Sequence, residues 1–266
     1  MRLGHVRTSA SMTMKECARN RFALVLLFVI PTLFCTLVSM TTSERALAFK
    51  LASVGEGIVV EVSARRESLI FIGVACVGLL TSFLALSLIQ KDSEANRRLL
   101  LCGYRAAELV VAKLTVLMGA VLLIAVYVAS ILLLWFTPRH FLLVVLGLVL
   151  AGFVHACYGL LVGSFARRDL EGVLLIVLLV NIDAGWLQNP VYYAEAQNHT
   201  LIRSLPAYFC AQATMVAAFT DHSVGWPFVW GLLYGAGLLG AALIIVIWKT
   251  RITRTAVVDG GGTAGG

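Results

Sequence analysis

His155 is the ionisable side chain that the sequence places nearest the centre of a long apolar run, within FVHACYG. Tyr158 follows three residues later, so the two side chains share one face of a helix. Polar groups at the centre of a bilayer are costly and usually face a bundle interior or a water-filled cavity, which makes a place in a translocation pathway one interpretation. The other interpretation is structural, a neutral imidazole hydrogen-bonded to a neighbouring helix.

Asp183 is the third candidate for the same pathway, and it lies near the expected outer end of an apolar run. At that position a capping role, or a side chain that reaches out to the membrane interface, explains the carboxylate equally well. The predicted pathway residues are therefore His155, Tyr158 and Asp183, and the structural alternatives stay open.

Enzyme motifs do not occur in the chain. It contains no HExxH, no GxSxG and no pair of carboxylates within one apolar run. A GxxxxGK[ST] phosphate-binding loop is absent, and no CxxC pattern or Cys/His cluster indicates a metal site. We therefore expect no catalytic residues, no metal and no cofactor in this chain, so any ATP and Mg²⁺ must be handled by a partner.

The composition requires a lipid environment. Of the 266 residues, 60% are hydrophobic and only 13% are charged, and the mean hydropathy is +0.92. A helix needs about 17 to 25 apolar residues to cross a hydrocarbon core of about 30 Å. Six runs qualify: Phe22–Ser39, Ser68–Gln90, Leu114–Phe136, Phe141–Phe165, Gly172–Trp186 and Pro227–Trp248.

The distribution of basic residues predicts the orientation. With the N-terminus inside, 15 of the 21 Lys and Arg residues lie in cytoplasmic segments, as the positive-inside rule requires. An even number of spans also returns the C-terminus to the cytoplasm. The net charge of +7 is explained by this basic inner surface facing anionic lipid, so we expect no nucleic-acid partner.

The inner stretch QKDSEANRRLLLCGYRAAELVVAKL, which follows the second run, has the features of a protein-docking surface. Apolar residues recur in it at near-helical spacing beside arginines, and Gly103 permits a turn. Exposed leucines are costly unless another protein covers them, although a solvated end of two spans is the alternative. The predicted docking residues are Arg97, Arg98, Leu99, Leu100, Tyr104, Arg105 and Glu108.

Three shorter segments complete the expected organisation. Residues 8–21 alternate apolar and charged side chains and fit a helix along the inner interface, with a solvated basic tail as the alternative. Residues 58–62 could form a short outer strand. Residues 205–219 are too short to cross, and Pro206 in the first turn favours a re-entrant or interfacial helix. The glycine-rich residues 259–266 are expected to be a disordered tail.

In this order of elements the chain resembles the membrane subunit of ABC transporters of the ABC-2 exporter class. The resemblance covers residues 1–258 and includes a first span with a central proline (FVIPTLF), an inner coupling loop (RRLLLCGYRAAELVVAKL) and short outer helices before the last span (LPAYFCAQATMVAAF). It implies an all-α membrane protein with six transmembrane helices, both termini cytoplasmic, an N-terminal interfacial helix, a cytoplasmic coupling helix and outer re-entrant helices.

The same resemblance implies function and partners. Two such subunits, identical or different, would work with a dimer of ABC ATPase subunits in the bacterial inner membrane and export an amphipathic drug, lipid or peptide. A channel or secondary transporter remains the alternative, although it would need a polar pore or paired intramembrane charges. A membrane-embedded enzyme would need convergent acid, base or nucleophile groups, which the sequence does not display.

Overall fold

The computed structural model describes residues 3–50, 59–90, 106–166, 168–189, 192 and 196–260. Within these residues six helices are long and apolar enough to cross a membrane, which confirms the predicted number of spans. The chain is therefore a multi-pass, predominantly helical membrane protein. The six are α2 (Arg21–Thr41), α3 (Ala64–Gln90), α5 (Ala106–Leu132), α6 (Phe141–Phe165), α7 (Asp169–Ile182) continued by the π-helix η1 (Asp183–Leu187), and α11 (Gly225–Gly260).

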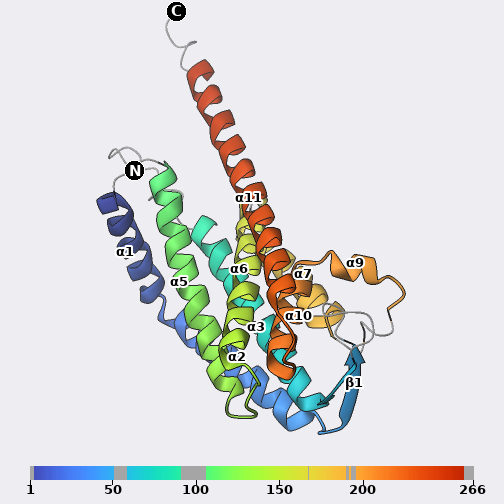
Figure 1. The fold of residues 1–266 in the computed structure, drawn as a ribbon. Helices are drawn as coiled ribbons and strands as arrows, with labels where there is room; N and C mark the ends of the chain where they lie inside the picture. The colour runs from blue at the N-terminus through green and yellow to red at the C-terminus, as the bar shows by residue number, and fades with distance from the viewer. Residues whose placement is uncertain are drawn as a thin grey trace, which may run out of the picture.

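The bundle has two distinct ends (Figure 1). At one end, which we call the hairpin end, strands β1 (Ala46–Lys50) and β2 (Val59–Ser63) connect α2 to α3. At the other, the N-terminal end, α1 (Leu3–Arg19) packs against the start of α5, and α11 extends past the other helices (Figure 1). The predicted orientation would place the N-terminal end in the cytoplasm.

The β-hairpin adds a small sheet to the expected helical fold. β1 pairs with β2 in an antiparallel register in which Ala48 lies opposite Glu61. The strand expected at residues 58–62 is confirmed as β2, because Val59, Val60 and Val62 are β-branched and favour an extended backbone. β1 was not predicted, since its sequence ALAFK carries no β-branched residue.

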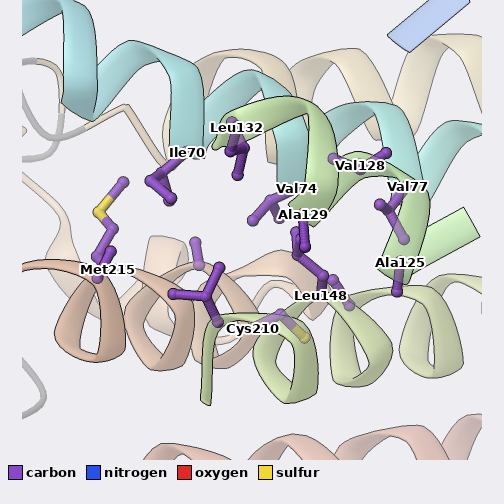
Figure 2. Close-up of a cluster of buried hydrophobic side chains, with 14 of the residues drawn as sticks. Ile70, Val74, Val77, Ala125, Val128, Ala129, Leu132, Leu148, Cys210 and Met215 are labelled. Atoms are coloured by element: carbon purple, nitrogen blue, oxygen red, sulfur yellow. The ribbon is translucent and has the colours of Figure 1, made fainter. Parts of the chain in front are cut away.

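Helices α3 and α6 form the centre of the bundle and touch along small residues. A Cβ atom at Gly159 of α6 would lie 2.3 Å from the Ser82 carbonyl oxygen of α3, so only glycine allows this approach. Toward the hairpin end, apolar side chains from α3, α5, α6 and α10 converge into one buried cluster (Figure 2). Ile70, Leu132 and Leu148 are among its fully buried members.

The helix α10 (Pro206–Phe219) is inserted into the bundle rather than laid on it, and most of its residues are buried. It packs against α6, α3 and α11. The backbone N–H of Arg139 donates to the carbonyl oxygen of Ala218 over 3.0 Å, so α10 ends beside the start of α6. A Cβ atom at Gly147 would lie 2.5 Å from Thr214 Oγ1, so α10 runs closely antiparallel to α6.

The predicted N-terminal and C-terminal elements agree with the structure in part. The helix expected from residues 8–21 is present as α1, whose Ser9 and Thr13 are buried, while its position at a membrane interface stays a prediction. Residues 259 and 260, expected to begin a disordered tail, are the last of α11. The remainder of that tail lies outside the described residues.

Candidate functional site

A buried carboxylate joins two separate parts of the chain. Asp183, with 5% of its surface exposed, is the first residue of η1. The backbone N–H of Ala207, in the first turn of α10, donates to Asp183 Oδ2 over 2.8 Å. The side-chain amide of Gln188 donates to Asp183 Oδ1 over 3.0 Å, and the same nitrogen lies 3.3 Å from the carbonyl oxygen of Ile202. Asp183 thus fastens α10 and the preceding segment to α7.

The local sequence explains why α10 needs this partner. Its N-cap residue is Leu205, whose side chain cannot accept a hydrogen bond, and its first helical residue is Pro206, which has no N–H. The first unsatisfied donor is therefore Ala207, and a carboxylate near the positive end of the α10 dipole is favourable. The capping role considered for Asp183 is confirmed, but the helix that it caps is α10.

His155 is enclosed at the contact between α6 and α3, with 1% of its surface exposed. Its Nδ1 donates to the carbonyl oxygen of Ala151 on its own helix over 2.9 Å, rather than to a neighbouring helix as the structural interpretation expected. The ring lies against Gly78, where a Cβ atom would come within 2.9 Å of it. Within the described residues neither His155 Nε2 nor the Tyr158 hydroxyl has a hydrogen-bond partner.

The carboxylate of Asp183 is the centre of a polar cluster drawn from three further helices. The antiparallel contact of α6 and α10, with Gly147 against Thr214, brings His155 and Tyr158 of α6 toward the first turn of α10, which Asp183 caps. Cys210 lies one turn further along α10, and Tyr234 of α11 reaches the same region through its bond to Ser204. The structure thus brings together the three predicted pathway residues. It adds Cys210, Gln188, Ala207 and Tyr234, which sequence reasoning missed. We call this set the Asp183 cluster.

Contacts along α3 give the depth of the cluster from the N-terminal end. Gly172, in the first turn of α7, lies against Leu86 of α3. Eleven helical residues separate Gly172 from Asp183, a rise of about 16 Å. This places the carboxylate level with the middle of α3, where Gly78 contacts the His155 ring. Asp183 lies four residues before the end of the candidate span Asp169–Leu187, as expected, but that end of the span packs level with the middle of α3.

Contacts from the hairpin end give the same depth. Eleven residues separate Ala218, which is bonded to Arg139 at the start of α6, from Ala207, again about 16 Å. The hydroxyl of Tyr234, nine residues or about 14 Å into α11, donates to the carbonyl oxygen of Ser204 over 3.0 Å. Because the hydrocarbon core is about 30 Å thick, the Asp183 cluster lies near the midplane.

Residues 196–205 lie beside Gln188 and Tyr234 at the same level, so a membrane centred on the six candidate spans would place them near mid-depth. They contain the five-residue helix α9 (His199–Arg203), and α9 lies on the outside of the bundle (Figure 1). Asn198, Thr200 and Ser204 are all exposed. Irregular backbone and polar side chains at this depth are tolerated only where they are covered by protein or line a water-filled cavity. We call residues 196–205 the re-entrant segment.

The predicted docking surface is only partly visible. Arg97, Arg98, Leu99, Leu100, Tyr104 and Arg105 lie outside the described residues. Glu108 lies in the first turn of α5 and is 2% exposed because α1 covers it, and its Oε2 is 3.3 Å from His5 Nδ1. Its carboxylate contacts α1 rather than projecting from the bundle, and its part in docking stays a prediction.

A second polar feature lies on the exposed face of α2 and α5. Thr32 Oγ1 donates to the carbonyl oxygen of Phe28 over 2.7 Å and lies 2.8 Å from the Tyr127 hydroxyl. These residues line a shallow apolar groove of about 500 Å³. The groove is lined by Phe28, Val29, Thr32, Leu33, Thr36, Leu37 and Tyr127. Pro31 is buried and does not line this groove, and α2 continues through this proline.

Within the described residues no three His, Cys, Asp or Glu side chains are grouped as metal ligands. The Asp183 cluster is suited instead to binding and moving protons or to positioning a polar group, because it combines a carboxylate, an imidazole and two phenols.

Comparison of the sequence with models of known protein families and with curated proteins found no match.

Proposed function

We propose that this chain is the membrane subunit of an ATP-driven exporter of the ABC-2 class, which moves an amphipathic drug, lipid or peptide out of a bacterial cell across the inner membrane. The observation that carries the proposal is the re-entrant segment. Its exposed polar residues near the midplane need water or a covering protein. Helices that end near the midplane instead of crossing the whole membrane are typical of transport proteins. Such a segment has no evident use in a purely structural membrane anchor.

The N-terminal end offers a mechanical connection to an ATPase. The predicted coupling stretch leads directly into α5, a helix of 27 residues and about 40 Å in length. Because α1 covers Glu108 and packs on α5, a push on this stretch would move α1 and α5 together. ATP binding and hydrolysis, with Mg²⁺, would take place in a separate ATPase dimer, and this chain would transmit the displacement.

The exposed face of α2 and α5 supports a second membrane subunit. Polar groups inside a membrane usually face other protein rather than lipid tails. The hydroxyls of Thr32 and Tyr127 instead lie in an open groove of this protomer. A second permease subunit, identical or different, would cover them.

A transporter that works without an ATPase is the second candidate. The burial of two ionisable side chains, His155 and Asp183, in one part of the bundle favours it, because paired ionisable groups near the midplane are typical of proton-linked transporters. The two candidates differ in whether the isolated chain, reconstituted alone and without nucleotide, supports selective flux. The exporter proposal predicts none.

The exporter proposal is tested by Leu100→Asp and Tyr104→Asp. The tagged chain is purified in mild detergent from membranes of its native cell, and ATP hydrolysis in the eluate is measured. A charge in the docking surface should lower co-purified ATPase activity at least about tenfold, while the amount of chain in the membrane is unchanged.

Thr137→Asp is the matched control, because Thr137 is exposed at the opposite, hairpin end. It should leave the co-purified activity at the parent level. Full ATPase activity with both docking variants would refute this surface, and the absence of ATPase activity from the parent eluate would refute the proposed function.

A further inference from the structure

The charges that can approach Asp183 are few. It is packed among α3, α7 and α10, and groups of α6 and α11 lie in the same region. Between Gly172 and Ile182, α7 has no ionisable side chain, and α10 offers only Tyr208 and Cys210. In its membrane part α11 offers only Tyr234. The remaining basic side chain from these helices near mid-depth is His155 of α6.

The basic residues of α3 are engaged or exposed elsewhere. Arg65 donates to Glu44 Oε1 over 2.8 Å, and Arg66 is exposed at the hairpin end. Glu67 is buried in the first turn of α3, three turns before Gly78. Beyond Glu67 the only ionisable group of α3 is the thiol of Cys76. Of the nearby segment α9, Arg203 is exposed and His199 is half-buried. Among the described residues of α3, α6, α7, α10 and α11, the basic side chain that can balance the charge on Asp183 near mid-depth is therefore His155.

Charge balance then sets the number of protons in the site. A buried carboxylate without a counter-charge is expensive, and a buried imidazolium alone is equally so. Asp183 and His155 together are neutral when they hold one proton, whether it is on the imidazole or on the carboxyl group. Nδ1 of His155 already carries the hydrogen that it donates to Ala151, and Nε2 has no hydrogen-bond partner among the described residues. Nε2 is therefore the ring nitrogen that can accept this proton.

We propose that His155 and Asp183 form a proton-binding site near the membrane midplane, which exchanges its proton with water on the hairpin side when the first turn of α10 separates from Asp183. The step moves one proton to water and leaves a carboxylate and a neutral imidazole. The hydrogen bond from Ala207 couples the two events, since its loss opens the segment that separates Asp183 from the exposed α9. This inference holds whether or not an ATPase drives the chain.

The proposal predicts a pH dependence with a definite sign. The closed form holds one proton, whereas a hydrated carboxylate and imidazole hold none above about pH 6.5. Because the closed form binds more protons, raising the pH above this value favours the open form. The ratio of open to closed molecules should rise by up to about tenfold for each pH unit.

Cys210 reports the opening, because it lies on α10 and is fully buried in the closed form. The other five cysteines are replaced by alanine, and the protein in lipid nanodiscs is treated with a membrane-impermeant maleimide between about pH 6.5 and about pH 8.5. The rate of maleimide labelling of Cys210 at each pH is divided by the labelling rate of the same protein unfolded in SDS. This ratio, the normalised rate, no longer contains the intrinsic pH dependence of thiol reactivity. A chain that retains only Cys76, buried on α3, is the matched control and should show a flat normalised rate.

Two variants identify the group that holds the proton. Asp183→Asn makes the site neutral without a proton, so the normalised Cys210 rate should no longer depend on pH. His155→Gln leaves Asp183 as the only proton acceptor, so the rate should keep its slope but be higher at every pH. A flat profile in the parent, or the parental slope in Asp183→Asn, would overturn the proposal.

Discussion

The two ends of the contact between α6 and α10 have opposite chemistry. Toward the hairpin end the contact is apolar and tight, with Leu148 and Met215 buried in one cluster (Figure 2). About two turns further along, α10 begins at its hydrogen bond to Asp183 of η1, and α6 carries His155; both side chains are polar and ionisable. A close-packed apolar contact has one arrangement, whereas a polar cluster changes its energy with each proton that it gains or loses. From this comparison we expect α10 to be anchored at its C-terminal end, and any release to begin at its N-terminal end, where it is held through Asp183.

The largest effect is expected in the close-packed part of the bundle. Gly159→Ala would place a methyl group 2.3 Å from the Ser82 carbonyl oxygen, a backbone atom that cannot rotate away. We expect a loss of about 1 to 3 kcal/mol or more, because overpacking moves the two helices apart. The measurement is the free energy of unfolding in mixed micelles with increasing SDS.

Gly119→Ala is the matched control for this substitution. Gly119 is in the interior of α5, and nothing lies within 4 Å of a Cβ atom there. The change should leave stability equal or raise it by up to about 1 kcal/mol, since alanine is the better helix former. Equal losses at both positions would contradict the tight contact.

A smaller effect is expected at the polar end. Asp183→Ala leaves the Ala207 N–H and the Gln188 amide without their acceptor, which should cost about 1 to 3 kcal/mol. Asn181→Ala, two residues earlier, removes only a bond to Val177 within α7 and should cost less than half as much. Thermal unfolding of both variants in the same detergent decides between them, and equal shifts would show that Asp183 does not hold α10.

The smallest effect is expected at the exposed face of α2 and α5. Thr32→Val and Tyr127→Phe each remove one hydroxyl of the pair at 2.8 Å. A double-mutant cycle of unfolding free energies should give a coupling of about 0.6 kcal/mol, the average for such bonds in membranes. A coupling indistinguishable from zero would mean that the pair does not hold α2 to α5.

The span count could be predicted from the sequence because the length of an apolar run is itself the physical requirement for crossing. A helix too short to cross was predicted at residues 205–219 for a related reason, and α10 is present there with 14 residues, whereas its burial among the spanning helices was not predicted. β2 was predicted from its valines. These features depend on local composition, which one sequence displays.

The depth and the partners of Asp183 could not be predicted in the same way. A run length does not say at which level a helix begins, and that level depends on how Gly172 packs against Leu86. The bond to Ala207 joins residues 24 positions apart through a loop, and no spacing rule applies to it. One signal was available, because Leu205 and Pro206 leave the first turn of α10 without a local cap.

Water access to the re-entrant segment from the hairpin side is the most direct test of this account. Thr200→Cys on α9 and Leu122→Cys on the exposed face of α5 are introduced separately into a cysteine-free chain in sealed, oriented vesicles. A membrane-impermeant maleimide added to the hairpin side should label Thr200→Cys and leave Leu122→Cys, which faces lipid near mid-depth, unlabelled. Absence of labelling at both positions would contradict the claim that the segment lines a water-filled pathway.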